Sequence, residues 1–480
     1  MSITDMRSIN NYEFTDFQED FEDTGKTHTH MVRRDPEVTY EDKFARAELL
    51  SKFPGLYTST IEGWSRSYYS GAEHMKAIQQ YATPNIPYGQ CDEIAYAKAA
   101  HNVRESLRSL PTVRAFNVLN ELDLVPYESS STAGYDYNGV KGPVGEFNHD
   151  RAIKRAKATL WSAIKDPEEG IEHVIRTYVA DVGYTRTQLT DLREKMKVRG
   201  VWGRAFHYIL LEGVVAAPLL EAFINSNTFF HIGKDPTVSV PNLLSYTKAQ
   251  AEWLTAIDWQ AFDATVSRFE INTAFDIIKE KVMFPNFETE QAFEISRQLF
   301  IHKMLAAPDG KIYWIHKGIP SGSYFTSTIG SIVNRLRIEY MWILKFNESP
   351  ITCYTQGDDS LIGYNDLFSP REMATLVKPL NWKINTSKSM TSRVPEWITF
   401  LGRSHKGGLN QRDLKRCLRL LILPEYPVTS GAISAYRAKS IYEDSGYTSF
   451  VLEEIANALR SKYGIASEQD VPRRLRPWKA

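Results

Sequence analysis

The chain has 480 residues, of which 42% are hydrophobic and 12% aromatic, so it has enough apolar material for a large folded core. Its 57 basic and 58 acidic residues give a formal net charge of −1, and overall charge therefore provides no argument for nucleic-acid binding. The three cysteines, Cys91, Cys353 and Cys417, are widely spaced, which argues against a disulfide framework or a structural zinc site.

The N-terminal part of the chain is polar. Residues 1–45 are rich in Asp, Glu, Thr and His, and we expect them to form a loosely ordered arm. From residue 46 onward, helix-like stretches such as Glu93–Leu107 and Arg151–Ile164 dominate, without internal repeats or a long linker. One interlocked body is therefore expected. No uncharged apolar run of 18 residues is apparent, so we expect no membrane span.

Two strand-like segments each lead into acidic residues. Leu254–Ile257 runs into Asp258 of DWQAFD, and Ile351–Tyr354 runs into QGDD, which holds Asp358 and Asp359. Leu361–Tyr364 follows QGDD, so this second region is predicted to be a β-hairpin. Nucleotidyl transfer needs two divalent cations that are held by few carboxylates. Either motif alone is usually a turn or a helix cap, but the two in this order favour a catalytic site.

A segment of small residues, GIPSGSYFTSTIGSIVN (318–334), lies between the two acidic motifs. Ser321 and Gly322 have little bulk, so a backbone or a nucleotide can approach closely. Ser321–Phe346 is predicted to be a long helix that begins in this turn. Its small polar face consists of Thr326, Gly330 and Asn334, and its apolar face of Ile329, Val333, Leu336 and Tyr340. Tight helix packing is the simpler explanation for the small residues, although it does not explain the polar stripe.

The C-terminal region is predicted to be helical at Leu409–Leu423 and Ser449–Tyr463. Two basic stretches, Arg412–Arg419 and the terminal PRRLRPWK, offer contacts to an RNA backbone. A solvated helix face and a free tail are equally good explanations for them.

The order DWQAFD, SGSYFT, GDD resembles motifs A, B and C of viral RNA-dependent RNA polymerases. GIPSGSYFT and GDDS are most similar to the motifs of partitiviruses, which are double-stranded RNA viruses, with picobirnavirus-type polymerases as near relatives. Four further segments resemble motifs G, F, D and E of the family in its order: SSTAGY (Ser130–Tyr135), KMKVRGVWGR (Lys195–Arg204), NTSKS (Asn385–Ser389) and TFLGR (Thr399–Arg403). The resemblance spans residues 130–403.

This resemblance implies an α+β right-hand polymerase with an antiparallel palm sheet, closed by contacts between fingers and thumb. The palm would comprise residues 250–283 and 320–408. The fingers would comprise residues 46–249 and 284–319. Residues 409–480 would form the thumb and C-terminal segment, and residues 1–45 an N-terminal arm that helps to bridge fingers and thumb.

The resemblance also implies roles for individual residues. Asp258 and Asp358 would hold two Mg²⁺ ions, for which Mn²⁺ can substitute, and Asp359 would be a further ligand. Asp263 and Thr326 would contact the ribose 2′-hydroxyl, the group that distinguishes RNA from DNA at the sugar. Many positive-strand relatives have Asn where this chain has Gly330, so that position does not explain ribose selection.

The remaining assignments concern the nucleotide and the template. Lys388 would donate a proton to the pyrophosphate leaving group. Trp202 is expected to pack rather than to stack on a base. The other nucleotide-binding candidates are Ser321, Gly322, Asn334, Lys197, Arg199 and Arg204, and the template-binding candidates are Ser131, Thr132 and Gly134.

By the same resemblance, the enzyme would replicate and transcribe a double-stranded RNA genome and start without a primer. Its partners would be template and product RNA, nucleoside triphosphates and the viral capsid protein, without a membrane. It would act in the virion interior and the host cytoplasm. Two alternatives remain: a reverse transcriptase, although those enzymes usually carry YxDD where this chain has QGDD, and a non-catalytic RNA-binding or capsid-linked protein, although the carboxylate set is intact.

Overall fold

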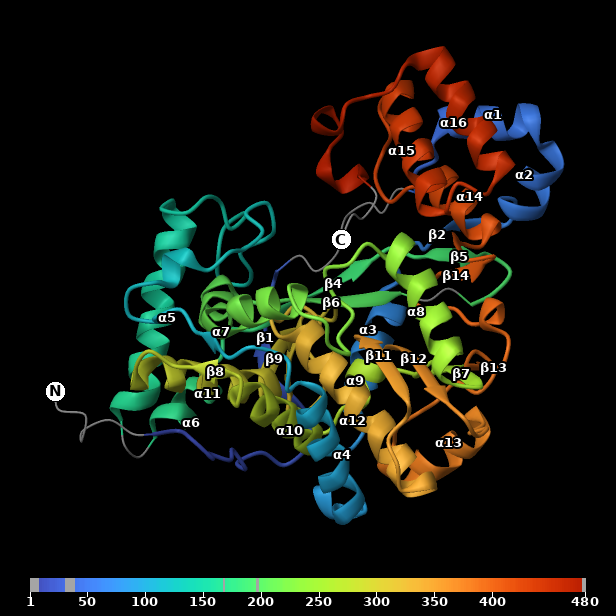
Figure 1. Ribbon diagram of the computed structural model, residues 1–480. Coiled ribbons are helices and arrows are strands. Elements are labelled where there is room, and N and C mark those ends of the chain that lie inside the picture. Colours follow the sequence, from blue (N-terminus) through green and yellow to red (C-terminus); the bar gives the residue numbers. More distant parts are fainter. Residues whose placement is uncertain (1–7, 31–38, 167–168, 196–197, 477–480) are drawn as a thin grey trace.

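A four-stranded antiparallel sheet carries both acidic motifs in the computed structural model, which describes residues 8–30, 39–166, 169–195 and 198–476 (Figure 1). Its strands, in spatial order, are β11 (Thr352–Gln356), β12 (Asp359–Tyr364), β7 (Trp253–Ala256) and β13 (Met390–Ser392). Gln356 pairs with Asp359 across a two-residue turn, which confirms the predicted hairpin. Because β12 also pairs antiparallel with β7, DWQAFD lies beside QGDD.

The helix α12 (Thr326–Phe346) packs against β11 and is buried along most of its length. Its predicted apolar face is buried, from Ile329 through to Tyr340. Residues 321–325 form the small-residue turn before it. Other helices of this region are α4 (Glu93–Ser106), α8 (Pro236–Gln250), α9 (Phe262–Thr265), α10 (Arg268–Lys279) and α13 (Pro370–Val377).

A second sheet has five strands, four of which lie in residues that the sequence assigns to the fingers (Figure 1). In spatial order they are β1 (Phe21–Thr27), β10 (Lys311–Ile315), β9 (Lys303–Ala306), β4 (Asp181–Arg186) and β6 (Arg199–Gly203). The helices of this region are α3 (Gly71–Gln79), α5 (Phe147–Lys165), α6 (Gly170–Arg176), α7 (Phe206–Ile224) and α11 (Phe287–Ile301). A short parallel pair, β3 (Val113–Arg114) with β8 (Val282–Met283), lies alongside.

The described part of residues 1–45 is built into the fold, so the expectation of a loose arm is wrong there. β1 pairs antiparallel with β10, and Ile9 and Phe14 are buried in the main core. The sequence FEDTGKT has no alternation of apolar residues, the pattern by which a strand is recognised. β1 is an edge strand, and its backbone hydrogen bonds do not depend on side-chain type.

The C-terminal helices share a core with a segment from the other end of the chain (Figure 1). The helices are α14 (Leu414–Ile422), α15 (Gly431–Asp444), α16 (Phe450–Tyr463), α1 (Lys43–Lys52) and α2 (Pro54–Thr60). The chain then enters β2 (Trp64–Arg66), which pairs with β5 (Leu189–Asp191). Residues 43–66, which form α1, α2 and β2, therefore join the C-terminal helices to the fingers region. The sequence assigned most of this segment to the fingers.

The predicted helix Leu409–Leu423 is wrong in its first part. Leu409–Gln411 forms β15, which pairs with β14 (Ser404–Lys406) across Gly407 and Gly408. The helix α14 begins only after Asp413, whose carboxylate accepts a hydrogen bond from the Lys415 backbone N–H. The predicted helix Ser449–Tyr463 is confirmed as α16, with Ser449 as its N-cap.

One helix of the described residues, α7, is long and apolar enough to cross a membrane. However, 72% of its apolar window is buried inside the fold, and it packs against α5 and α11. The core helix of a folded protein meets the same criteria of length and composition. The burial of α7 is that of a core helix.

Candidate active site

The three predicted metal-binding aspartates lie at the same end of the paired strands β7 and β12. Asp258 follows β7, Asp358 lies in the hairpin turn, and Asp359 is the first residue of β12. The backbone N–H of Ile257 donates to Ser360 Oγ at 3.2 Å, a side-chain contact that joins the two motifs. Strand pairing thus brings together residues that are 100 positions apart in sequence.

The electrostatics of this cluster reflect its crowding. The side chains of Asp358 and Asp359 are exposed to solvent, but many protein atoms lie around them. Burial, together with repulsion from Asp358 and Asp258, raises the pKa of Asp359 to about 7. Burial also raises the pKa of Asp358, with a further contribution from Asp258 that Arg199 opposes. A bound cation would relieve this repulsion.

The residues present suit a hard divalent cation. Carboxylate oxygens are the ligands that Mg²⁺ and Mn²⁺ prefer. No three His, Cys, Asp or Glu side chains of the described residues, Asp258, Asp358 and Asp359 included, form a complete metal-binding cluster by themselves. A metal ion here would therefore need further ligands from outside the protein. Mg²⁺ at phosphate-transferring sites usually takes one or two carboxylates and completes its coordination with phosphates and water. The pair Asp258 and Asp358, with Asp359 beside them, provides that number.

Asn334 holds the acidic turn rather than facing the nucleotide. Its amide nitrogen donates to the carbonyl oxygens of Gly357 and Asp359, both at 3.0 Å, and its amide oxygen accepts from Trp259 Nε1 at 2.9 Å. The residue is fully buried. Because these contacts use both ends of its amide, the assignment of Asn334 to ribose binding is corrected to a positioning role.

The glycine one turn earlier on α12 allows this arrangement. A Cβ on Gly330 would lie 3.8 Å from Gly357 Cα, so the helix passes in van der Waals contact with the acidic turn. Ser331 Oγ accepts from the Gly357 backbone N–H at 2.8 Å. The small polar face of α12 therefore supports the turn that carries Asp358.

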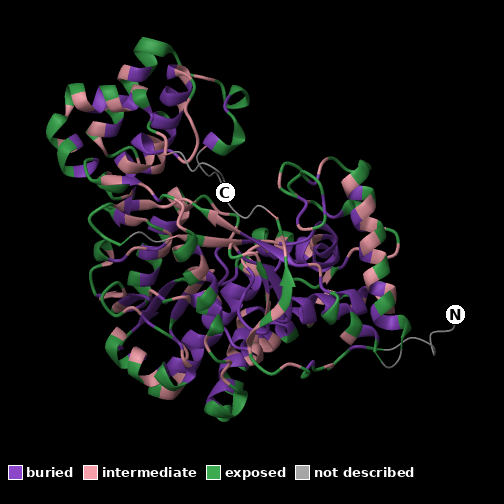
Figure 2. Cartoon of the chain, turned by 180° about the vertical axis from the view of Figure 1, so that it is seen from behind, coloured by how far each residue is buried: buried purple, intermediate pink, exposed green. Residues whose placement is uncertain are grey.

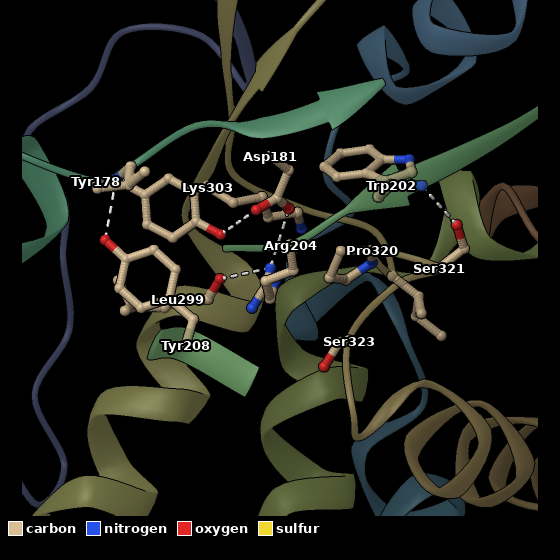
Figure 3. Close-up of polar contacts among 12 residues, drawn as sticks. Tyr178, Asp181, Trp202, Arg204, Tyr208, Leu299, Lys303, Pro320, Ser321 and Ser323 are labelled. Atoms are coloured by element: carbon tan, nitrogen blue, oxygen red, sulfur yellow. Dashed lines mark hydrogen bonds and ion pairs between the residues drawn. The ribbon is translucent and has the colours of Figure 1, made fainter. Parts of the chain in front are cut away.

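The loop before α12 is held by backbone contacts. The N–H of Trp202, on β6, donates to Ser321 Oγ at 3.2 Å (Figure 3). A Cβ on Gly322 would lie only 1.7 Å from the Trp202 carbonyl oxygen. Thr326 Oγ1 donates to the Pro320 carbonyl oxygen at 2.8 Å. The close approach expected at these small residues is thus made by a neighbouring strand, and Trp202 is buried by packing, as predicted.

Two glycine-to-alanine substitutions should therefore have opposite effects on stability. Gly322→Ala forces its Cβ into a carbonyl oxygen and is expected to lower the free energy of unfolding by about 1–3 kcal/mol. Gly330→Ala adds a methyl group in ordinary contact inside a helix and is expected to raise it by about 0.5–1 kcal/mol. Denaturant unfolding of both variants beside the wild type measures this. Equal stability of the two would contradict the close packing of β6 on residues 321–323.

The basic candidates of the segment Lys195–Arg204 separate into different environments. Arg199 is exposed at the start of β6, and its positive charge opposes the pKa increases of Asp263 and Asp358. Burial, followed by repulsion from Asp358, raises the pKa of Asp263 to about 7. Arg199 and Asp263 therefore lie near enough to Asp358 to interact with it electrostatically. Lys197 lies outside the described residues.

Arg204 is not available to a triphosphate, which corrects its assignment. Its side chain is fully buried, and its guanidinium contacts Glu212 at 3.1 Å. The same guanidinium contacts Asp181 at 3.5 Å (Figure 3). It also donates to the Leu299 carbonyl oxygen at 3.0 Å. A buried guanidinium needs such partners, since an unpaired charge in the interior is very unfavourable.

Two acidic residues that the sequence analysis missed complete this network. Asp181 also accepts from the Tyr178 hydroxyl at 2.5 Å, and burial, which Arg204 opposes, raises the pKa of Asp181 to about 6. Glu212 accepts from the Tyr324 backbone N–H at 2.8 Å and from the Ser323 hydroxyl. The network thus connects Arg204 to the loop 321–325. Glu212 could have been singled out from the sequence, because it is a charged residue within the apolar run FHYILLEGVVAA.

Lys388 is exposed on a loop that is tied to Asp258. The Asn385 N–H donates to the Asp258 carbonyl oxygen at 2.8 Å, and the Asp258 N–H donates to Ser389 Oγ at 2.9 Å. These two contacts place the loop beside the carboxylate cluster. A role for the Lys388 ammonium remains a prediction.

The template-binding candidates lie in a folded loop next to β6. Lys141 Nζ donates to Ser131 Oγ at 2.6 Å and to the Thr132 carbonyl oxygen at 2.9 Å. Gly134 has φ +104°, and a Cβ there would lie 2.9 Å from Ala205 Cα. The loop therefore packs closely on the junction of β6 and α7, and its template contacts remain a prediction.

Comparison with known proteins identifies the family. The sequence matches the family of viral RNA-dependent RNA polymerases over residues 40–458. The RNA-directed RNA polymerase of Cryptosporidium parvum virus 1 (strain KSU-1) is 33% identical over 138 residues, which cover 28% of this chain and 26% of that protein. The RNA-directed RNA polymerase of Atkinsonella hypoxylon virus (isolate 2H) is 23% identical over 296 residues, covering 49% of this chain and 44% of that protein. The aligned part thus spans less than half of either relative's length.

The fold agrees with this match. The crystal structure of the RNA-dependent RNA polymerase of a human picobirnavirus superposes with a TM-score of 0.66 at 16% sequence identity, covering 89% of this chain and 86% of that one. The mixed α+β architecture is therefore that of right-hand polymerase structures. Since the family match covers most of the sequence, and the carboxylates of its motifs converge in space, the chain belongs to the family of viral RNA-dependent RNA polymerases.

Proposed function

We propose that this chain is an RNA-directed RNA polymerase that copies an RNA template by two-metal nucleotidyl transfer. The observation that carries the proposal is the meeting of Asp258 and Asp358 at the ends of paired strands, next to Arg199. Both aspartates would hold two Mg²⁺ ions, with Asp359 as an auxiliary ligand. When bound, the metals supply activation of the attacking 3′-hydroxyl and stabilisation of charge on the triphosphate.

The chain's own residues would bind and orient the nucleotide. Arg199 would contact the triphosphate, since its side chain is exposed and its charge acts on Asp358. Asp263 and Thr326 would hydrogen-bond the ribose 2′-hydroxyl, and Lys388 would give a proton to the departing pyrophosphate. In the overall step, the 3′-oxygen of the growing strand forms a bond to the α-phosphorus while the bond from that phosphorus to the pyrophosphate oxygen breaks.

We also propose a partitivirus-type context. The enzyme would serve a double-stranded RNA genome, start without a primer and work with a capsid protein in the virion interior and the host cytoplasm. The similarity of GIPSGSYFT and GDDS to partitivirus motifs supports this. Primer-independent starts can be tested on a template with a blocked 3′ end, where a product that keeps a labelled 5′-triphosphate is expected. If only extended primers appear, this part of the proposal fails.

The partnership with the capsid protein is tested by copurification of this chain with the capsid protein of the same virus. Absence of this chain from purified particles would contradict the partnership.

The activity itself is tested by radiolabelled UTP incorporation. Purified full-length chain with Mg²⁺, a single-stranded RNA template and the four ribonucleotides is expected to give template-length RNA, and chelation of the metal should abolish it. Efficient use of deoxynucleotides in place of ribonucleotides would favour a reverse transcriptase. RNA binding without any extension, in Mg²⁺ and in Mn²⁺, would favour a non-catalytic RNA-binding protein.

A further inference from the structure

The helix α5 (Phe147–Lys165) carries an unusual concentration of positive charge for a chain whose net charge is −1. It has one acidic residue, Asp150, against five basic residues: Arg151, Lys154, Arg155, Lys157 and Lys165. Its opposite side is apolar and buried, consisting of His149, Ala152, Ala156, Leu160, Ala163 and Ile164. In the described part of the chain, no ion pair engages Arg151, Lys154, Lys157 or Lys165. Arg151 lies over the Tyr137 ring, with its guanidinium 5.1 Å from the ring centroid. Among the described residues, no ring contact uses the charges of Lys154, Lys157 and Lys165 either.

Aromatic residues share the solvent-facing side with these charges. The residues Phe147, Arg151, Lys154, Trp161 and Lys165 follow one another at helical spacing along it, and we call them the outer face of α5. Phe147 is 78% exposed, and Trp161 is partly exposed. Figure 2 shows exposed and intermediate residues along this side of the helix, at the edge of the molecule. Alternating cations and aromatic rings are typical of surfaces that bind single-stranded nucleic acid.

The surface beside Trp161 is hollowed. A cavity of about 730 Å³ has a lining that includes Trp161, Ser162, Lys165, His173 and one acidic residue, Asp166. It adjoins a second cavity of about 190 Å³ that is lined by Arg155, Ser162 and His173. There, Arg155 Nη1 is buried without a hydrogen-bond partner. The first cavity offers a place for an unpaired base against the indole ring. Arg155, at the second cavity, already contacts Asp136 and the Tyr137 ring.

The helix α5 is tied to the loop that follows the segment resembling motif G, through residues beside the outer face. Asn148, in the first turn of α5, donates through Nδ2 to the carbonyl oxygens of Asn138 and Val140, at 2.8 and 2.7 Å. Arg155 contacts Asp136 of the same loop at 3.3 Å. The helix therefore extends from this loop along the side of the fingers region (Figure 1).

We propose that the outer face of α5 binds single-stranded RNA and guides the template toward the loop at residues 131–134. Arg151, Lys154 and Lys165 would contact phosphates, and Phe147 and Trp161 would stack on bases. This inference rests on the proposed polymerase function, since the bound strand is the template. Single strands are favoured over duplexes because stacked, paired bases do not offer their faces to Phe147 and Trp161.

Binding of a fluorescent 20-nucleotide oligouridine to the full chain tests the proposal at several salt concentrations. Lys154→Gln combined with Lys165→Gln is expected to reduce the slope of log K against log salt by about 1.4, because two phosphate contacts are lost at about 0.7 each. Trp161→Leu keeps the apolar packing but removes the aromatic ring, and is expected to weaken binding about 5- to 160-fold. Phe147→Ala should act in the same direction without affecting the core.

Matched controls separate this surface from general charge effects and from the polymerase activity. Lys345→Gln with Lys439→Gln removes two exposed lysines elsewhere and should leave the slope unchanged. A hairpin RNA that primes itself and has one templating nucleotide has no long single strand for the outer face to bind, so on this proposal the α5 variants should extend it at the wild-type rate. If the wild type extends no RNA, the polymerase proposal fails. If the wild type extends RNA but the variants bind oligouridine with wild-type affinity, the α5 proposal is overturned. It is also overturned if the variants lose as much affinity for a 20-base-pair duplex as for oligouridine.

Discussion

Replacing Asp358 by Asn is expected to lower the rate of nucleotide incorporation at least about a thousandfold. The substitution keeps the size of the side chain but removes the charge, and metal stabilisation of charge in the transition state is worth several kcal/mol, at about 1.4 kcal/mol per tenfold in rate. The turn itself should stay folded, because Asn334 and Ser331 hold it through the backbone atoms of Gly357 and Asp359. Single-turnover extension of a primed RNA measures the effect.

Companion variants make this result specific. Asp258→Asn should match the loss at Asp358, whereas Asp359→Asn should cost less if Asp359 is an auxiliary ligand. Asp366→Asn is the matched control, because Asp366 is an exposed carboxylate beyond the far end of β12. It should retain the wild-type rate. A fully active Asp358→Asn variant with an unchanged unfolding curve would exclude the metal assignment.

Replacing Arg204 by Met is expected to lower the free energy of unfolding by about 3–5 kcal/mol. Two buried carboxylates, Asp181 and Glu212, would lose their cation, and removing one partner of a buried ion pair leaves an uncompensated charge. The loop at residues 321–325 would lose its anchor as well, because Glu212 also holds Ser323 and Tyr324. Chemical denaturation monitored by tryptophan fluorescence measures the change.

Arg199→Met is the matched comparison, because this arginine lies only five residues away but is exposed. It should leave stability within about 0.5 kcal/mol of the wild type. It should raise the KM for nucleoside triphosphates instead, since the side chain is exposed and its charge acts on Asp358. If instead Arg204→Met is as stable as the wild type and has a higher KM for nucleoside triphosphates, the assignment of Arg204 to triphosphate binding would be restored.

The contrast between these two arginines also explains how the site is kept in shape. β6 carries Arg199 toward the carboxylates, and its Trp202 contacts Ser321 and Gly322 directly. Arg204, just beyond β6, reaches the same loop through Glu212. The strand that delivers the positive charge and the loop that precedes α12 are therefore held together at two points. We expect them to move as one unit.

The sequence by itself determined the family, the order of the motifs and the identity of the acidic residues. DWQAFD and QGDD each follow an apolar strand, and that local pattern predicts a sheet edge with carboxylates at it. The hairpin at Gly357 and the apolar stripe of α12 were predictable for the same reason, since both depend on residues close in sequence. Charge and hydrophobic period are local properties.

Only the tertiary structure decided which polar side chains face the site and which face the core. Arg199 and Arg204 look alike in sequence, yet one is exposed and the other is enclosed by Asp181 and Glu212. Asn334 was assigned to the ribose, but its partners are backbone atoms of the acidic turn. β1 went unpredicted because FEDTGKT has no apolar alternation, and the strand that fixes it lies almost 300 residues away. The physical reason is the same in each case: a side chain's role depends on partners distant in the chain, and those partners are set by packing, not by local pattern.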